Sequence, residues 1–271
     1  MSFSGRSESR SHPTIGGTGL PRPSEHTGDC QIFQRADHKT WDPVRSVDYD
    51  LQSVPVPQIL ILTAVQIEAK AVARALGLAR QGDFWRDRDL RICLRTIGIG
   101  SRDLPALEPS TSPEFVILAG LAGALSPSLK VGDVVIDECP TGLKDGFSGH
   151  FGKIHSTDRL VATPQAKSEL FASTHAIAVE MEAQAVRPWV SQLPSAFVLI
   201  RSISDSASDG INPRLLRLVD HHGRARPGAI AVELIRSPRL IPELLHLASN
   251  SRKSSLELGK AVKWIVNRIQ K

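Results

Sequence analysis

The chain has 271 residues, 41% of them hydrophobic and 23% charged, which is typical of a globular protein with one large α/β domain or two small ones. The odd number of cysteines argues against a disulfide framework, and their positions, Cys30, Cys93 and Cys139, show no metal-ligand spacing. No apolar run reaches the roughly 18 residues of a membrane-spanning helix. The net charge of +5 comes from residues 211–271, whose twelve basic and four acidic side chains argue for a local basic surface and against a generally nucleic-acid-binding protein.

The first 56 residues are rich in Ser, Gly, Pro, Asp and Arg and show no sustained hydrophobic period. Such a segment cannot bury enough apolar area to offset the cost of ordering, so residues 1–56 are predicted to be a largely disordered extension. Their start also lacks the apolar stretch of a secretory signal, which predicts a cytoplasmic protein. An α/β domain is expected over 57–236, and a basic amphipathic helical tail over 237–271.

Short apolar runs alternate with segments of helical period along the predicted domain. We expect helices at 66–77, ending at Gly77, at 163–173, capped by Thr163, and from Ala183 onward. After Pro213 the pattern is helical, with breaks expected at Pro227, Pro238 and Pro242. The predicted strands are 58–64, 89–100, 114–120, 131–138, 176–181 and 195–204. Strands that are apolar throughout are covered on both faces, so the sequence predicts a three-layer α/β/α sandwich.

Polar residues gather where these strands end. Glu182 follows one buried strand, while Arg201, Ser204 and Asp205 end another. Each has a simple structural explanation on its own, such as a helix cap. In a sheet covered on both faces, however, strand ends line one crevice. A pair of carboxylates with an arginine there suits cleavage of a glycosidic bond, one acid protonating the leaving group and one acting on the nucleophile.

Four segments in order, "ILTAVQIEAKAV", "SPSLKVGDVV", "AIAVEMEAQAV" and "VLIRSISD", resemble the successive motifs of the nucleoside phosphorylase superfamily over about residues 58–210. They are most similar to its methylthioadenosine/S-adenosylhomocysteine nucleosidase branch. From about residue 153 onward the chain also resembles bacterial phosphorylase-like proteins associated with hopanoid biosynthesis. The resemblance implies a central mixed sheet and a homodimer, with no cofactor and no metal.

The resemblance also implies roles at the leaving group and the sugar. Asp205 would protonate N7 of adenine, with Ser204 orienting it. Glu182 would accept hydrogen bonds from the ribose 2′ and 3′ hydroxyls, and Met181 would pack on the sugar. Glu180, in the same motif, is expected to be a structural neighbour of the site.

Further roles concern the nucleophile and the base. Glu68 would hold and deprotonate the attacking water, with Arg201 nearby. The backbone at Val161 would recognise the edge of adenine. Glycine backbone after two strands, at Gly98 and Gly123, would allow a ligand to approach closely.

Three departures from the superfamily pattern bear on the nucleophile and the substrate. Leu121 and Leu118 stand where phosphate users carry a hydroxyl and an arginine, which favours water, although Arg201 or Lys70 could hold an anion. Leu160 stands where nucleosidases have a base-stacking aromatic. In the segment 101–113, Pro105 and Pro109 limit a usually long helix to a turn or two; this shortened wall would open the pocket towards a bulkier 5′ group or would indicate a decayed site.

The predicted function is cleavage of the N-glycosidic bond of a 5′-substituted adenosine-type nucleoside, releasing adenine. One alternative is a phosphate-dependent phosphorylase acting on an adenosylated lipid such as adenosylhopane, and another is a non-catalytic binding protein for adenosyl nucleosides. A generic dinucleotide-binding domain is a weaker rival, since "IGIGSRDL" lacks the third glycine of that fingerprint.

The tail 237–271 allows two interpretations: its apolar face packs on the sheet or a second subunit, or it lies on an anionic membrane surface. His221 and His222 have no acid-and-histidine spacing that indicates zinc.

Overall fold

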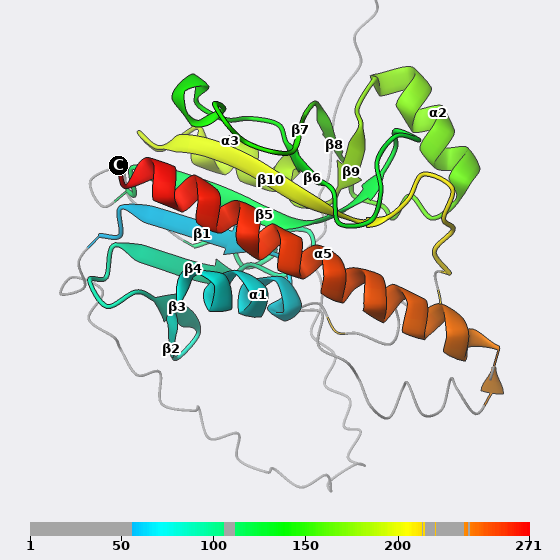
Figure 1. Cartoon of the computed structure of the whole chain (residues 1–271), viewed down its shortest axis with the longest axis horizontal. Coiled ribbons are helices and arrows are strands. Elements are labelled where there is room, and N and C mark those ends of the chain that lie inside the picture. The colour runs from blue at the N-terminus through cyan, green and yellow to red at the C-terminus, as the bar shows by residue number, and fades with distance from the viewer. Residues whose placement is uncertain (1–55, 106–111, 213, 215–219, 221–235, 238) are drawn as a thin grey trace, which may run out of the picture. The chain divides into compact units, whose positions relative to one another are not determined.

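The computed structural model describes residues 56–105, 112–212, 214, 220, 236–237 and 239–271, all within one compact unit, Asp50–Lys271 (Figure 1). The predicted extension, apart from Val56, lies outside the described residues. So do His221 and His222 and the expected breaks at Pro227 and Pro238.

A mixed sheet of ten strands forms the centre of this unit, in the order β2-β3-β4-β1-β5-β10-β6-β7, with β9 pairing β5 and β8. The parallel centre consists of β4, β1, β5 and β10, while β3 runs antiparallel to both its neighbours and β6 runs antiparallel to β10 and parallel to β7. The strand bounds are β1 Ile59–Thr63, β2 Ala79–Gln81, β3 Phe84–Arg86, β4 Ile92–Thr96, β5 Phe115–Ala124, β6 Val134–Ile136, β7 His150–Phe151, β8 Ile154–Ser156, β9 Ala178–Glu180 and β10 Ala196–Asp205.

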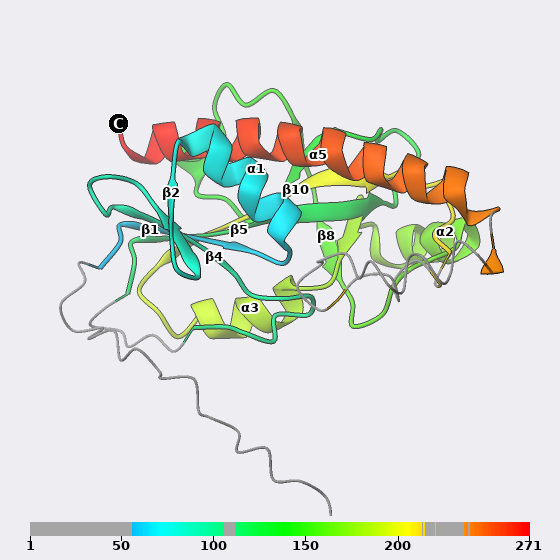
Figure 2. The ribbon, with the colours of Figure 1, turned by 90° about the horizontal axis from the view of Figure 1, so that it is seen from below.

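Helices cover both faces of the sheet, as Figure 2 shows: α1 (Gln66–Leu76) and α5 (Leu240–Ile269) lie on one face and α3 (Ala183–Val190) on the other. The predicted α/β/α sandwich is therefore confirmed. A further helix, α2 (Pro164–Thr174), begins as expected, with the Thr163 hydroxyl accepting a hydrogen bond from Ala166 N. Gly77 ends α1 in the left-handed conformation at φ 69°, which glycine adopts without strain.

The core has two main halves because β1 is apolar from Ile59 to Leu62 and buried on both faces. Ile59 and Ile61 point to the face under α1 and α5, whereas Leu60 and Leu62 point to the face under α3. This alternation follows from the two-residue period of a strand. Apolar side chains on both faces are typical of the parallel centre of a sheet.

The C-terminal helix belongs to the first of these core halves. Leu258, Val262 and Ile265 are fully buried, and Gly259 allows α5 to lie close to the backbone of α1 at Ala71. This apolar face packs inside the molecule and is not available to a membrane surface. Among the described helices, none is both long and apolar enough to cross a bilayer.

The expected break at Pro242 is wrong. Pro242 lies in the first turn of α5, where a backbone N–H would have no partner inside the helix, so its missing N–H costs nothing there. The helix continues without interruption to Ile269.

Two further predictions need correction. The strand expected over 114–120, with Gly123 beyond its end, is longer than predicted: β5 continues through Gly120 and Gly123, because β10 and β9 pair with it as far as Ala124. The strand expected over 89–100 is confined to β4, because Leu90 before it and Gly98, Gly100 and Ser101 after it take positive φ angles in turns.

Candidate active site

One cavity of about 210 Å³ opens where β5, β9 and β10 end. Eight predicted site residues line it, and the other two, Arg201 and Gly98, do not. The lining consists of Ala64, Val65, Glu68, Ile99, Leu121, Ala122, Gly123, Thr157, Arg159, Leu160, Val161, Val179, Glu180, Met181, Glu182, Ser204, Asp205 and Ile211. Apolar and acidic side chains therefore share one small space.

Glu68 is held by backbone amides from two elements. Its Oε2 accepts from Ala64 N at 2.9 Å and from Val65 N at 3.0 Å, and its Oε1 accepts from Leu121 N at 2.8 Å. Its place in the first turn of α1 suits a negative charge. Burial nevertheless raises the pKa of Glu68, and the charge of Arg201 and these hydrogen bonds only partly oppose that rise.

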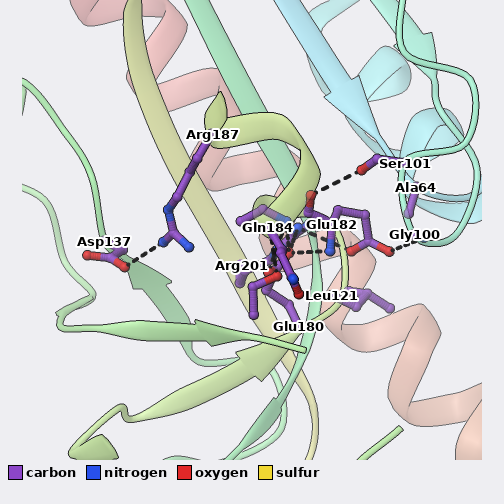
Figure 3. A network of polar contacts seen from close by, with 12 residues as sticks. Ala64, Gly100, Ser101, Leu121, Asp137, Glu180, Glu182, Gln184, Arg187 and Arg201 are labelled. Atoms are coloured by element: carbon purple, nitrogen blue, oxygen red, sulfur yellow. Dashed lines mark hydrogen bonds and ion pairs between the residues drawn. The ribbon is translucent and has the colours of Figure 1, made fainter. Parts of the chain in front are cut away.

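Arg201 lies beneath the cavity and is fully buried on β10. Its Nη2 donates to Oε2 of Glu180 and, at 3.3 Å, to Oε2 of Glu182 (Figure 3). Its Nη1 packs against Gly120, where an added Cβ would come within 1.9 Å of it. The arginine therefore neutralises carboxylates from below the cavity floor.

Glu180 has the structural role expected of it, although it also lines the cavity. Its carboxylate accepts from the backbone N–H of Glu182 at 3.0 Å and of Ala183 at 3.0 Å, where α3 begins. Burial raises the pKa of Glu180, but Arg201, Ser156 and the two amides outweigh burial and bring the pKa below its ordinary value. Glu180 is thus the ionised partner of Arg201.

Glu182 begins α3 and is 5% exposed. Gly100 N donates to its Oε1 at 3.2 Å, and the Ser101 hydroxyl donates to its backbone oxygen at 3.1 Å. Burial is the main cause that raises the pKa of Glu182 to about 7; Arg201 opposes the rise, whereas Glu180 and Glu68 add to it. Gly98 contributes only to the turn that presents Gly100, since its carbonyl accepts from Ser101 N at 3.1 Å.

Asp205 ends β10 with both carboxylate oxygens occupied. Oδ1 accepts from the Ser204 hydroxyl at 2.7 Å, and Oδ2 accepts from Lys167 Nζ at 2.5 Å. Lys167, on α2, is 0% exposed, and sequence reasoning missed it. In "TPQAKSELFAS" it looks like an ordinary polar helix residue, and no local signal marks it as buried.

Within the described residues, no group of three or more His, Cys, Asp or Glu side chains could hold a metal ion. The buried carboxylates of Asp205, Glu180 and Glu182 pair with Lys167 and Arg201. Four carboxylates, of Glu68, Glu180, Glu182 and Asp205, line the cavity wall, and the two cations that face them, Arg201 and Lys167, lie behind that wall.

Comparison with solved structures places this fold among nucleosidases and related hydrolases. The 5′-methylthioadenosine nucleosidase of Arabidopsis thaliana matches with a TM-score of 0.54 and 15% identity over 79% of this chain and 96% of that one. The 5′-methylthioadenosine/S-adenosylhomocysteine nucleosidase of Neisseria meningitidis matches with a TM-score of 0.51 and 21% identity, over 77% and 97%. Futalosine hydrolase of Helicobacter pylori matches with a TM-score of 0.52 and 18% identity, over 78% and 98%.

These likenesses confirm the fold that the sequence motifs implied. At the level of sequence, no protein-family model matches the chain and no curated protein matches it either. The assignment of chemistry to the cavity consequently depends on its own residues.

Proposed function

We propose that this protein hydrolyses the N-glycosidic bond of a 5′-substituted adenosine-type nucleoside and releases adenine. The observation that carries the proposal is a single cavity that collects an acid at the end of β10, a carboxylate at the start of α3 and a third carboxylate on α1. Two of the structures of the same fold are named for 5′-methylthioadenosine or S-adenosylhomocysteine, which are substrates of this class.

Asp205 acts on the leaving group. Its carboxyl transfers a proton to N7 of the base while the electrons of the C1′–N9 bond move into the purine, so that the base leaves neutral. Ser204 fixes the plane of the carboxyl through its hydrogen bond to Oδ1. General acids contribute about 10²- to 10⁴-fold to such steps.

Glu182 holds the sugar. A carboxylate is an acceptor-only group and can take hydrogen bonds from both ribose hydroxyls. Gly100 N and Arg201 fix its two oxygens from the protein side. Met181 lies beside it in the cavity lining and packs on the ribose, while Leu160 and Val161 contact the base.

Water is the nucleophile that the charges favour. Glu68 is placed to accept its proton, and Glu180 and Glu182 add negative charge that Arg201 alone does not balance. A phosphate dianion would be repelled by these groups. Among the described residues lining the cavity the only cation is Arg159, whose side chain is 89% exposed, and Lys70 lies on the surface outside the cavity.

The test is adenine release from methylthioadenosine, S-adenosylhomocysteine and adenosine, each with and without phosphate. We expect release that does not depend on phosphate, a loss of about 10²- to 10⁴-fold in Asp205→Asn, and no change in the control Asp158→Asn. Asp158 suits the control because its side chain is 79% exposed.

Three results would contradict the proposal. Release that requires phosphate, with a sugar phosphate product, would indicate a phosphorylase. Tight binding without release would indicate a binding protein, and full activity in Asp205→Asn would show that another group is the acid.

A further inference from the structure

Lys167 occupies a site built for an ammonium ion. It is 0% exposed, and its three protons have three acceptors: Asp205 Oδ2 at 2.5 Å, Ser206 O at 2.7 Å and Asp209 O at 3.0 Å. A neutral amine has only two protons and would leave one of these acceptors without a donor. The cage thus matches the three donors of a lysine ammonium group.

This cage also fixes one wall of the cavity. Lys167 joins α2 to the turn that follows β10, and the same turn is closed by Asp209, whose Oδ2 accepts from Ser206 N at 2.8 Å. Just beyond it, Ile211 N donates to Ala162 O at 2.8 Å, which places Ile211 opposite Val161 in the cavity lining. The lysine therefore holds the segment that encloses the proposed base.

The Asp205 carboxylate also packs against the backbone of β5. An added Cβ at Gly123 would lie 2.9 Å from Oδ2, so the carboxylate already packs against the glycine. Ser204 holds the other oxygen at 2.7 Å. Lys167, Ser204 and Gly123 together keep the carboxyl group in one orientation at the cavity wall.

We propose that Lys167 is a positioning residue for leaving-group protonation: it orients the Asp205 carboxyl and stabilises the carboxylate formed when the proton has moved to the base. The inference rests on the proposed function. In that step the Asp205 O–H bond breaks, an N7–H bond forms on the base, and the C1′–N9 electron pair goes to the purine. The negative charge left on Asp205 then faces the fixed cation of Lys167 in a water-poor site. In such a site a preorganised cation stabilises a developing negative charge most strongly.

A lysine with only a structural role would leave the pH profile unchanged, and this difference defines the test. In Lys167→Met the carboxyl no longer faces a cation and keeps its proton to higher pH. The falling limb of the pH–kcat profile is therefore expected to move to higher pH, while kcat at the optimum falls about 100-fold and KM changes little. Lys167→Arg retains the charge and is expected to keep the limb near its wild-type position.

The experiment compares adenine release by the wild type, Lys167→Met, Lys167→Arg and the exposed control Lys263→Met between pH 5 and 9. A kcat loss in Lys167→Met with an unmoved limb, or a wild-type kcat, would overturn the inference while leaving the proposed function intact. If Lys167→Met does not fold, a limb displaced in Lys167→Arg would overturn it equally. A wild-type protein that releases no base from any substrate would instead refute the proposed function and the inference with it.

Discussion

Replacing Gly120 by alanine, a change of one methyl group, is expected to lower the free energy of unfolding strongly. Gly120 lies inside β5, beside the buried guanidinium of Arg201, and a Cβ there would come within 1.9 Å of Nη1, 3.1 Å of Cζ and 3.1 Å of Glu68 Oε1. Its backbone is not in the left-handed region, so alanine meets no conformational strain of its own. The whole effect of Gly120→Ala must come from displacing Arg201.

The Arg201 side chain cannot move aside without a large free-energy cost, because it is fully buried and its Nη2 donates hydrogen bonds to Glu180 and Glu182. Overpacking a filled core costs about 1–3 kcal/mol, and breaking a buried ion pair costs about 3–5 kcal/mol. We therefore expect Gly120→Ala to lower the free energy of unfolding by about 3–5 kcal/mol. For a unit of this size that corresponds to a Tm lowered by roughly 6–20 °C.

Thermal and denaturant unfolding of Gly120→Ala and of the matched control Gly142→Ala would measure this difference. Gly142 has no heavy atom within 4 Å of an added Cβ, and its backbone also avoids the left-handed region. The control is expected to keep its stability within about 1 kcal/mol of the wild type. Equal stability of the two variants would refute the reasoning, since it would mean that Arg201 moves aside without loss.

Three further predictions concern single residues. Between pH 4.5 and about 7 the folded state holds a proton on Glu182 that the unfolded state releases, so stability should fall by at most about 3 kcal/mol as the pH rises through this window. Glu182→Gln should reduce that slope in melts at pH 5 and pH 8, and an unchanged slope would contradict the assignment; Glu68, whose pKa is also raised, adds a slope of the same sign, whereas Glu180, with its lowered pKa, acts only below this window. Leu258→Ala should cost about 2–5 kcal/mol in urea unfolding because Leu258 is fully buried on the inner face of α5, whereas Leu245→Ala, 65% exposed on the same helix, should change stability by less than about 0.5 kcal/mol. Thr163→Ala should cost about 1 kcal/mol by removing the cap of α2, and an unchanged Tm would show that the cap is dispensable.

The residues that sequence reasoning found are those that end apolar strands. Asp205 ends β10 and Glu182 follows β9, so the strand pattern alone placed these two at one edge of the sheet, whereas Arg201 lies within β10. The parallel pairing of β1, β5 and β10 then brings Glu68 to the same edge, since α1 starts where β1 ends. Local pattern and topology agree at these positions, which is why they were predictable.

Lys167 was not predictable for a physical reason. Its burial depends on the turn after β10, about forty residues further along the chain, and nothing in its own helix reports that contact. The β2–β3 hairpin is a different case, because Gly82 and Asp83 lie between two short runs and Gly82 has a φ of 59°. A glycine-bearing two-residue turn is a recognised hairpin signal, so this element could have been found.

The buried charges also limit where protons can reside. Glu68, Glu180 and Glu182 face one guanidinium, and a site with little water cannot keep three carboxylates ionised against a single cation. Glu180 retains its charge because Arg201 and two backbone amides bind it, so the excess proton falls to Glu182 or Glu68, whose pKa values are both raised. Ribose hydroxyls that donate to Glu182 would stabilise its ionised form and leave the proton to Glu68 or to solvent. Binding of the sugar to Glu182 and the protonation state of Glu68, the proposed water-activating carboxylate, are therefore coupled. The coupling runs through Arg201, whose charge acts on both Glu182 and Glu68.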